Sequence, residues 1–315
     1  MQMNHYIHRK PQSLSARAAK LLLKLMNRKH VLRKEMHSGS IPQEPAKIPT
    51  RLRPKAYCEY KSFAGHGYWL VSPKPVQTKH HSLAARAENT DTLALYLHGG
   101  AYVHNMTKYH WNLIDGLLEK TSVPFLIPDY PLAPTYTCVD TIDFMQNLYN
   151  DVVMSLQPER LIVMGDSAGG GLALSLGSQW KQSSIPPHQL ILIAPWLDIS
   201  MSHPQIPAFA ATDLMLDIEG PLLAGRAYRG SLAEDDWRHS PKYADINGVA
   251  PIALFIGSND MLYADILDLR NKLQQLNHTY QYFEYPDMFH VWPAVTMLPE
   301  AKQAIDQLAK LIYNP

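Results

Sequence analysis

Short apolar runs alternate with segments of helical periodicity over most of this 315-residue chain. The runs predict strands at residues 57–63, 67–71, 93–97, 123–127, 161–164, 190–193, 252–256 and 280–285. Helical patterns separate the later runs, at residues 142–156, 172–180 and 264–276, and another follows the last run at 299–313. Buried strands that alternate with helices form a mostly parallel sheet covered on both faces. We therefore expect an α/β fold with a doubly wound, eight-stranded sheet.

The composition excludes several classes of protein. Lys and Arg together number 29 and Asp and Glu 28, so the net charge of +1 creates no field that would attract nucleic acid. The uncharged apolar stretches are shorter than the roughly 20 residues of a membrane-spanning helix. We expect neither a nucleic-acid partner nor a transmembrane span.

Two features bear on the cellular compartment. Cys58 and Cys138 are too few for a disulfide-rich secreted scaffold or a thiolate metal site. We expect both to be reduced, although one bridge between them is not excluded. Lys20 and Lys24 interrupt the N-terminal apolar run, and no small-residue cleavage site follows it, so no secretory signal is predicted. The expected location is cytoplasmic.

Basic charge is concentrated at the N-terminal end. Residues 1–37 contain nine Lys and Arg against Glu35 alone, which gives +8 and leaves −7 on the remainder. A helix with Ser13 as its cap is predicted, because these apolar residues repeat at helical spacing: Leu14, Ala18, Leu21, Leu25 and Leu32. Three interpretations stay open. The apolar face packs on the acidic remainder, residues 13–36 make peripheral contact with an anionic membrane, or the segment is an unstructured tail. A homodimer also stays open.

The strongest chemical motif is Gly165-Asp166-Ser167-Ala168-Gly169, a G-x-S-x-G sequence between the strand at 161–164 and the following helix. This context is typical of a nucleophile elbow, a strained strand-to-helix turn that exposes its serine. An ordinary glycine-rich turn is the alternative, but the flanking strand and helix favour the elbow. We expect Ser167 to be a nucleophile.

A second motif, His98-Gly99-Gly100-Ala101, follows the strand at 93–97. Glycines let backbone N–H groups converge to hold the oxyanion that forms when a serine attacks a carbonyl. We expect an oxyanion hole from the N–H groups of Gly99, Gly100 and Ala168, with His98 holding the loop by hydrogen bonds. No phosphate-binding motif and no zinc-binding spacing of histidines occurs, so no cofactor and no metal are expected.

An elbow serine needs a histidine base and a carboxylate that orients the histidine. In folds with this elbow the chain order is serine, acid, histidine. Asp260 follows the strand at 252–256 and His290 follows the strand at 280–285. Asp265 is an alternative acid inside the next predicted helix, whereas Asp287 is too close to His290 in sequence. We expect the triad Ser167, Asp260 and His290.

The interval between the strands at 190–193 and 252–256 is too long for a structureless loop in a compact domain. It contains a predicted helix at 218–228 and follows the carboxyl end of a strand, where open α/β sheets place their sites. We expect residues of about 198–245 to form a lid or cap insertion. Candidate substrate-binding residues, each of which also suits a core position, are Tyr102, Val103, Met215, Leu216 and Trp292.

Five segments, in this order, resemble the hormone-sensitive-lipase-like family of esterases and lipases, which has the α/β-hydrolase fold. They are HGGA at 98–101, DYPLAP at 129–134, GDSAGG at 165–170, DML at 260–262 and FH at 289–290. The resemblance covers roughly residues 55–315 and implies the same triad and oxyanion hole. It also implies that the N-terminal segment, residues 1–50, is part of a helical cap over a catalytic domain of residues 51–315.

The chain departs from the family pattern at Ala101, Pro131, Thr135 and Val291, where the family commonly has Gly, Arg, Glu and Gly. These departures bear on supporting contacts and pocket shape more than on chemistry. The expected activity is hydrolysis of short- to medium-chain acyl esters, as small-molecule substrates, through an acyl-enzyme. Two alternatives stay open: amide hydrolysis by the same triad, as in deacetylases, and small-molecule binding without catalysis.

Overall fold

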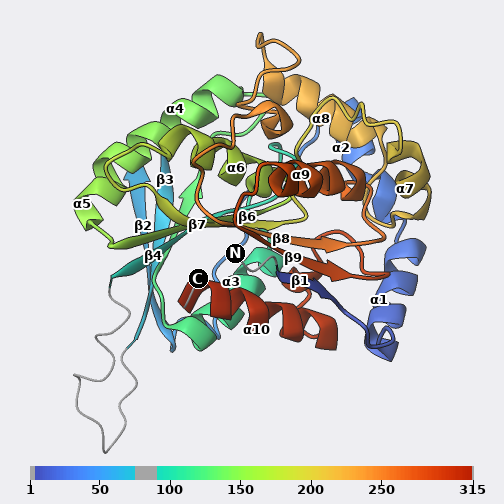
Figure 1. The fold of residues 1–315 in the computed structure, drawn as a ribbon, viewed down its shortest axis with the longest axis horizontal. Helices are drawn as coiled ribbons and strands as arrows, with labels where there is room; N and C mark the ends of the chain where they lie inside the picture. The colour runs from blue at the N-terminus through green and yellow to red at the C-terminus, as the bar shows by residue number, and fades with distance from the viewer. Residues whose placement is uncertain (1–3, 75–90, 314–315) are drawn as a thin grey trace, which may run out of the picture.

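The computed structural model describes residues 4–74 and 91–313, and its centre is one sheet with helices on both faces (Figure 1). In these residues the sheet has nine strands: β1 (Asn4–Ile7), β2 (Ala56–Phe63), β3 (His66–Pro73), β4 (Thr92–Leu97), β5 (Phe125–Asp129), β6 (Arg160–Asp166), β7 (Pro187–Ile193), β8 (Ile252–Gly257) and β9 (Tyr280–Tyr285). Their spatial order is β1-β9-β8-β7-β6-β4-β5-β3-β2. The β2–β3 and β3–β5 pairs are antiparallel and the remaining pairs are parallel.

The α-helices of the described residues are α1 (Leu14–Leu25), α2 (Val31–Ser38), α3 (Lys108–Thr121), α4 (Cys138–Leu148), α5 (Met154–Leu156), α6 (Ala168–Trp180), α7 (Ile206–Thr212), α8 (Glu219–Arg229), α9 (Tyr263–Gln275) and α10 (Pro299–Tyr313). Helices α3 and α10 pack against each other on one face of the sheet, and α4, α6 and α9 cover the other (Figure 1). The central strands are buried between these layers, which explains their continuous apolar sequences. The predicted doubly wound, mostly parallel sheet is confirmed.

The prediction of eight strands is corrected to nine. The additional strand, β1, lies at the edge of the sheet and pairs parallel with β9, with Asn4 opposite Gln281 and Ile7 opposite Glu284. Four residues are too few to show a strand period, and β1 pairs with a strand near the other end of the chain. Helix α3 was also absent from the predicted elements.

The basic N-terminal segment forms two helices rather than one. Asn27 adopts a left-handed conformation with φ of 49°, and a 3₁₀ turn at Arg28–His30 leads into α2. Helix α2 packs against α8, and its Leu32 and Met36 contact the core. For this second half of the segment, the interpretation that its apolar side packs on the protein is confirmed.

Helix α1 is oriented differently from the prediction. Its apolar stripe faces outward, with Leu14 80% exposed, Leu21 59% and Leu25 74%. The helix rests instead on small or recessed side chains, including the fully buried Ala16 and the partly buried Leu23. Periodicity identified the helix, but its apolar residues do not mark the side that packs.

Both cysteines are free: Cys58 is half-buried on β2, and Cys138 is buried at the start of α4. No helix in residues 4–74 and 91–313 is long and apolar enough to cross a bilayer. Within the same ranges, no three His, Cys, Asp or Glu side chains gather in a way that would hold a metal ion.

Candidate active site

Ser167 lies at the sharp turn between β6 and α6. Its φ of 52° and ψ of −121° lie outside the regions that serine ordinarily adopts, so the turn is strained. Backbone hydrogen bonds hold it in place: the Ser167 N–H donates to the Ile193 carbonyl, and the Trp196 N–H donates to the Ser167 carbonyl, both at 2.9 Å. Glycine is needed at 169, because a Cβ there would lie 2.1 Å from the Leu97 carbonyl oxygen. The turn therefore has the strained geometry expected of an elbow.

Three side chains that follow different strands form one chain of hydrogen bonds. The distance from Ser167 Oγ to His290 Nε2 is 2.8 Å, and from His290 Nδ1 to Asp260 Oδ2 it is 2.7 Å. Because β6, β7, β8 and β9 are parallel, their carboxyl ends bring these residues to one edge of the sheet. Asp260 is fully buried, and its other oxygen accepts the Leu262 N–H at 2.9 Å. Both oxygens of the carboxylate are thus engaged, which sets its orientation toward the imidazole.

The electrostatic surroundings of His290 favour its protonated form. Burial lowers the pKa of His290, but the charge of Asp260 and the hydrogen bond to it raise the pKa, and Asp213 and Asp166 add to that rise. The net pKa lies above the ordinary value of 6.5. An imidazole in this setting is stabilised once it has accepted a proton, as a general base requires.

The loop after β4 carries the HGGA motif and requires a correction to the predicted oxyanion hole. The Gly99 N–H donates to Asp166 Oδ1 at 3.1 Å, so this donor is occupied by a buried carboxylate. The N–H groups of Gly100, Ala101 and Ala168 donate no hydrogen bond to any atom in the described part of the chain. Gly100 and Ala168 therefore stay predicted donors, and Gly99 is withdrawn.

Asp166, the variable position before the serine in the motif, joins the elbow to this loop. It is buried, and it accepts a hydrogen bond from the Tyr96 hydroxyl as well as from Gly99. His110 Nε2 lies 3.4 Å from its other oxygen. Burial raises the pKa of Asp166, but the charge of His110 and the hydrogen bonds from His110 and Tyr96 lower it by more, so the net pKa is below its ordinary value. No sequence pattern marks Tyr96 or His110, because their contacts with Asp166 join different strands and helices.

His98 holds the loop by hydrogen bonds, as predicted. Its Nδ1 donates to the Gly99 carbonyl at 2.7 Å, and the Tyr130 hydroxyl donates to the His98 carbonyl at 2.6 Å. The two rings are stacked, with 4.3 Å between their centroids. Burial, followed by the charge of His110, lowers the pKa of His98 to about 4, so the ring is neutral near pH 7. Tyr130 belongs to the DYPLAP segment, which therefore supports the HGGA loop.

Asp213 is a second buried carboxyl beside the triad, and sequence analysis missed it. Its Oδ1 accepts the N–H groups of Met215 at 2.7 Å and Leu216 at 2.9 Å. Its Oδ2 accepts the N–H of Met261, the neighbour of Asp260, at 2.9 Å. Burial, followed by the charge of Asp260, raises the pKa of Asp213 to about 6. No sequence signal identifies this residue, because the contact joins the insertion to a loop 48 residues further along the chain.

The predicted substrate-binding residues lie in two environments: Met215 and Leu216 are half-buried, whereas Tyr102, Val103 and Trp292 are fully buried. The Tyr102 ring stacks on Tyr228 of α8 with 3.7 Å between centroids. The Trp292 ring packs against Tyr285 at 4.9 Å. The three buried side chains thus support the core, and the two in the insertion retain accessible surface.

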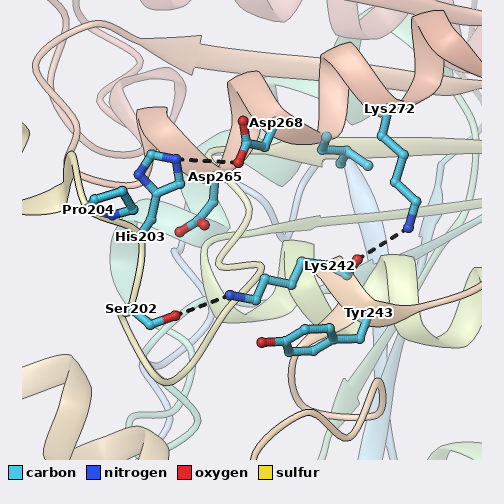
Figure 2. Close-up of a pocket in the computed structure, with 9 residues that line it drawn as sticks. Ser202, His203, Pro204, Lys242, Tyr243, Asp265, Asp268 and Lys272 are labelled. Atoms are coloured by element: carbon cyan, nitrogen blue, oxygen red, sulfur yellow. Dashed lines mark hydrogen bonds and ion pairs between the residues drawn. The ribbon is translucent and has the colours of Figure 1, made fainter.

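Asp265, the alternative acid, lines a cavity of about 340 Å³ (Figure 2), and Ser167, Asp260 and His290 are not among the residues that line this cavity. The cavity is lined by Ser202, His203, Pro204, Lys242, Tyr243, Asp265, Asp268, Leu269 and Lys272. Asp265 is buried, and its Oδ2 has no hydrogen-bond partner among the described residues. Burial, followed by the charge of Asp198, raises the pKa of Asp265 to about 6. Asp260, and not Asp265, is the carboxylate that contacts His290.

The sequence and fold of the chain are similar to those of known proteins. The sequence model of the α/β hydrolase fold matches residues 94–294. An esterase of Acinetobacter venetianus is 30% identical over 237 residues, which cover 72% of this chain and 76% of that protein. An acetyl-hydrolase of Streptomyces hygroscopicus is 28% identical over 75% of this chain and 81% of its own. A crystal structure of a hormone-sensitive lipase from a metagenome library has the same fold, with a TM-score of 0.76 and 20% identity over 96% of this chain and 99% of that one.

The matched region includes the elbow serine, the aspartate after β8 and the histidine after β9. The curated relatives are an esterase and an acetyl-hydrolase, and the expectation of a carboxylesterase- or lipase-like hydrolase is confirmed. The chain therefore belongs to the α/β-hydrolase family, and the curated proteins that it resembles include esterases.

Proposed function

We propose that Ser167, His290 and Asp260 form the catalytic triad of a carboxylic-ester hydrolase. The observation that carries this proposal is the continuous chain of hydrogen bonds, 2.8 Å from serine to histidine and 2.7 Å from histidine to aspartate. A base within hydrogen-bond reach of the nucleophile, itself oriented by a third group, is the arrangement that activates a hydroxyl.

In the acylation step, the Ser167 hydroxyl gives its proton to His290 Nε2 while Oγ attacks the carbonyl carbon of the ester. The carbonyl oxygen becomes an oxyanion, which the N–H groups of Gly100 and Ala168 stabilise. The intermediate then collapses, the bond to the alcohol breaks, and the alcohol leaves with the proton from His290. The product of this step is an ester between Ser167 and the acyl group.

In the deacylation step, water takes the place of the alcohol. His290 accepts a proton from water as the water oxygen attacks the acyl carbon. Collapse of the second intermediate releases the acid and returns the proton to Ser167. The Asp260 carboxylate stabilises the imidazolium of His290.

We infer that residues 1–50 and about 198–245 act together as a cap over this site. In support, α2 packs against α8, and His30 Nδ1 lies 2.9 Å from Asp217 Oδ2. Arg33 Nε lies 3.5 Å from the same oxygen. A Cβ at Gly220 would lie 2.9 Å from the Arg33 backbone nitrogen, so glycine permits the close approach of the two helices. Asp213 connects this cap to the triad.

The proposed substrates are esters with short- to medium-chain acyl groups. In support, the apolar surface that the insertion retains near the triad comes from only moderately sized side chains, Met215 and Leu216. The similarity to an acetyl-hydrolase points the same way. We expect turnover of p-nitrophenyl esters to be greatest for short chains and to fall toward palmitate.

The experiment compares wild type with Ser167→Ala on the p-nitrophenyl ester series. Loss of the nucleophile is expected to lower kcat by roughly a million-fold, because the serine and its base act as a unit. Full activity in Ser167→Ala would overturn the proposal. A matched pair of ester and anilide substrates tests the amidase alternative, which gains support if the anilide is cleaved faster. A folded wild type with no turnover on either would favour the binding-only alternative.

A further inference from the structure

Helix α1 presents an apolar face to solvent. This face, called here the α1 apolar face, consists of Leu14, Leu21, Leu22, Leu25 and Met26, whose exposed fractions range from 56% to 80%. With about 100° between successive residues, Leu14, Leu21 and Leu25 lie within an arc of about 40°. Five large apolar side chains gathered in this way form an exposed patch, which in a folded protein marks an interaction surface.

The opposite side of the same helix is the one that packs on the protein. Ala16 is fully buried there, and Ala19 and Leu23 contact the core. The N-terminal end is fixed as well, because the Ser13 N–H and hydroxyl both donate to the Glu300 carboxylate, at 2.7 and 2.9 Å. These contacts fix the rotation of the helix about its axis, and its leucines therefore point outward.

The basic residues of α1 and α2 differ in their partners. Lys34 of α2 forms no ion pair among the described residues, but Arg33 of the same helix pairs with Asp217 and Glu219. In contrast, Arg17, Lys24 and Arg28 are exposed, and among the described residues they form no ion pair. Arg17 and Lys24 border the α1 apolar face along one side, and Arg28 lies two residues beyond its last member, Met26. The face is thus bordered by cations that the protein itself does not use.

Helix α1 also contacts the loop that carries His290. Lys20 Nζ and Gln12 Nε2 each donate to the backbone carbonyl of Asp287 at 3.1 Å. Asp287 lies three residues before His290, in the turn that follows β9. Whatever binds the α1 apolar face is therefore held near this loop.

We propose that the α1 apolar face docks the protein on an anionic lipid surface, with its leucines in the acyl boundary and Arg17, Lys24 and Arg28 at the headgroups. Exposed large apolar side chains bordered by unpaired basic ones are the combination that holds a helix in the plane of a membrane interface. A second copy of the chain is the less favoured occupant, because two copies that met through this face would bring like charges together, and like charges repel. The docking is a binding event and does not depend on the proposed catalysis.

The test is sedimentation with vesicles, using the full chain. Wild type is expected to bind vesicles of phosphatidylcholine and phosphatidylglycerol, to bind pure phosphatidylcholine much less, and to be released by added salt. Leu21→Glu/Leu25→Glu should lower the bound fraction by about tenfold or more. The matched control is Leu156→Glu/Leu276→Glu, since these leucines are 43% and 42% exposed on other elements, and it should bind like wild type. Thermal unfolding checks that both variants are folded.

A charge variant, Arg17→Gln/Lys24→Gln/Arg28→Gln, tests the other half of the proposal and should also lose binding to anionic vesicles. Failure of wild type to bind these vesicles would overturn the proposal, as would unchanged binding of the Leu21→Glu/Leu25→Glu variant. Equal binding to neutral and anionic vesicles would overturn the role of the basic side chains. A second copy would be assigned to the face instead if wild type bound no vesicles, light scattering showed that it is a dimer, and the Leu21→Glu/Leu25→Glu variant were a monomer.

Discussion

The carboxylate of Asp213 accepts a hydrogen bond of 2.9 Å from the backbone N–H of Met261. Because Met261 directly follows Asp260, this bond ties the insertion between β7 and β8 to the loop that orients His290. Asp213 is also one of the negative charges that raise the pKa of His290, after Asp260. The insertion therefore contributes to the electrostatics of the triad as well as to the surface above it.

Asp213→Asn is expected to move the acid limb of the kcat/KM profile to lower pH. Loss of a nearby negative charge destabilises the imidazolium of His290 and so lowers its pKa. Since His290 acts as a base only when neutral, activity would then appear at lower pH than in wild type. The measurement is kcat/KM for p-nitrophenyl butyrate across the acid and neutral range. Asp268→Asn, which removes a 67% exposed carboxylate, is the control. An unchanged midpoint in Asp213→Asn would mean that its role is structural alone.

The same chemical change at two aspartates separates the two candidate acids. Asp260→Asn is expected to lower kcat by about ten-thousand-fold, because the amide no longer holds His290 in the required tautomer. Asp265→Asn should retain nearly full activity, because Asp265 lines the cavity of Figure 2, which the triad residues do not line. Steady-state kinetics on one ester give both values. Comparable losses in the two variants would contradict the assignment of Asp260.

Asp265→Asn is also expected to change the pH dependence of stability. Burial and Asp198 raise the pKa of Asp265 to about 6, so between roughly pH 4 and pH 6 the native state binds more protons than the unfolded chain. The free energy of unfolding of wild type therefore decreases as pH rises through that window. Asparagine does not ionise. The free energy of unfolding of Asp265→Asn minus that of wild type should therefore increase by about 1.4 kcal/mol between about pH 5 and pH 8. Urea unfolding at the two pH values measures this, and a pH-independent difference would show that Asp265 titrates normally.

Two glycine substitutions test the packing of the elbow. In Gly169→Ala, the new Cβ would lie 2.1 Å from the Leu97 carbonyl oxygen and 2.5 Å from that of His98. Because both contacts are with backbone, we expect destabilisation of about 3 kcal/mol or more, with displacement of Ser167. The control is Gly116→Ala in α3, where the nearest atom, in Ile305, is 3.4 Å away. That change should be neutral or stabilise by up to about 1 kcal/mol. Chemical denaturation measures the free energy of unfolding of both variants, and equal changes in the two would contradict the prediction.

Local patterns were sufficient to predict most of the sheet and the residues of the candidate site. The run predicted at 252–256 is β8, Ile252–Gly257, and the pattern predicted at 299–313 is α10, Pro299–Tyr313. The G-x-S-x-G sequence identified the turn at Ser167, because glycine is required where backbones approach closely. Strand order then placed Asp260 and His290 at the same edge, since parallel strands end together. Each of these inferences depends on residues close in sequence or on chain order.

The remaining features were decided by contacts between distant segments. The sequence by itself determined most of the strands and helices, and the positions of the proposed nucleophile, acid and base. Only the tertiary structure decided that Asp166 occupies the Gly99 N–H, that Asp213 reaches Met261, and that α1 turns its leucines outward. The physical reason is that a buried carboxylate accepts hydrogen bonds from whichever donors the packed layers bring to it. A helix likewise packs on the side whose shape complements the surface that it contacts. Periodicity records how a helix is composed, whereas its orientation depends on the surface that it meets.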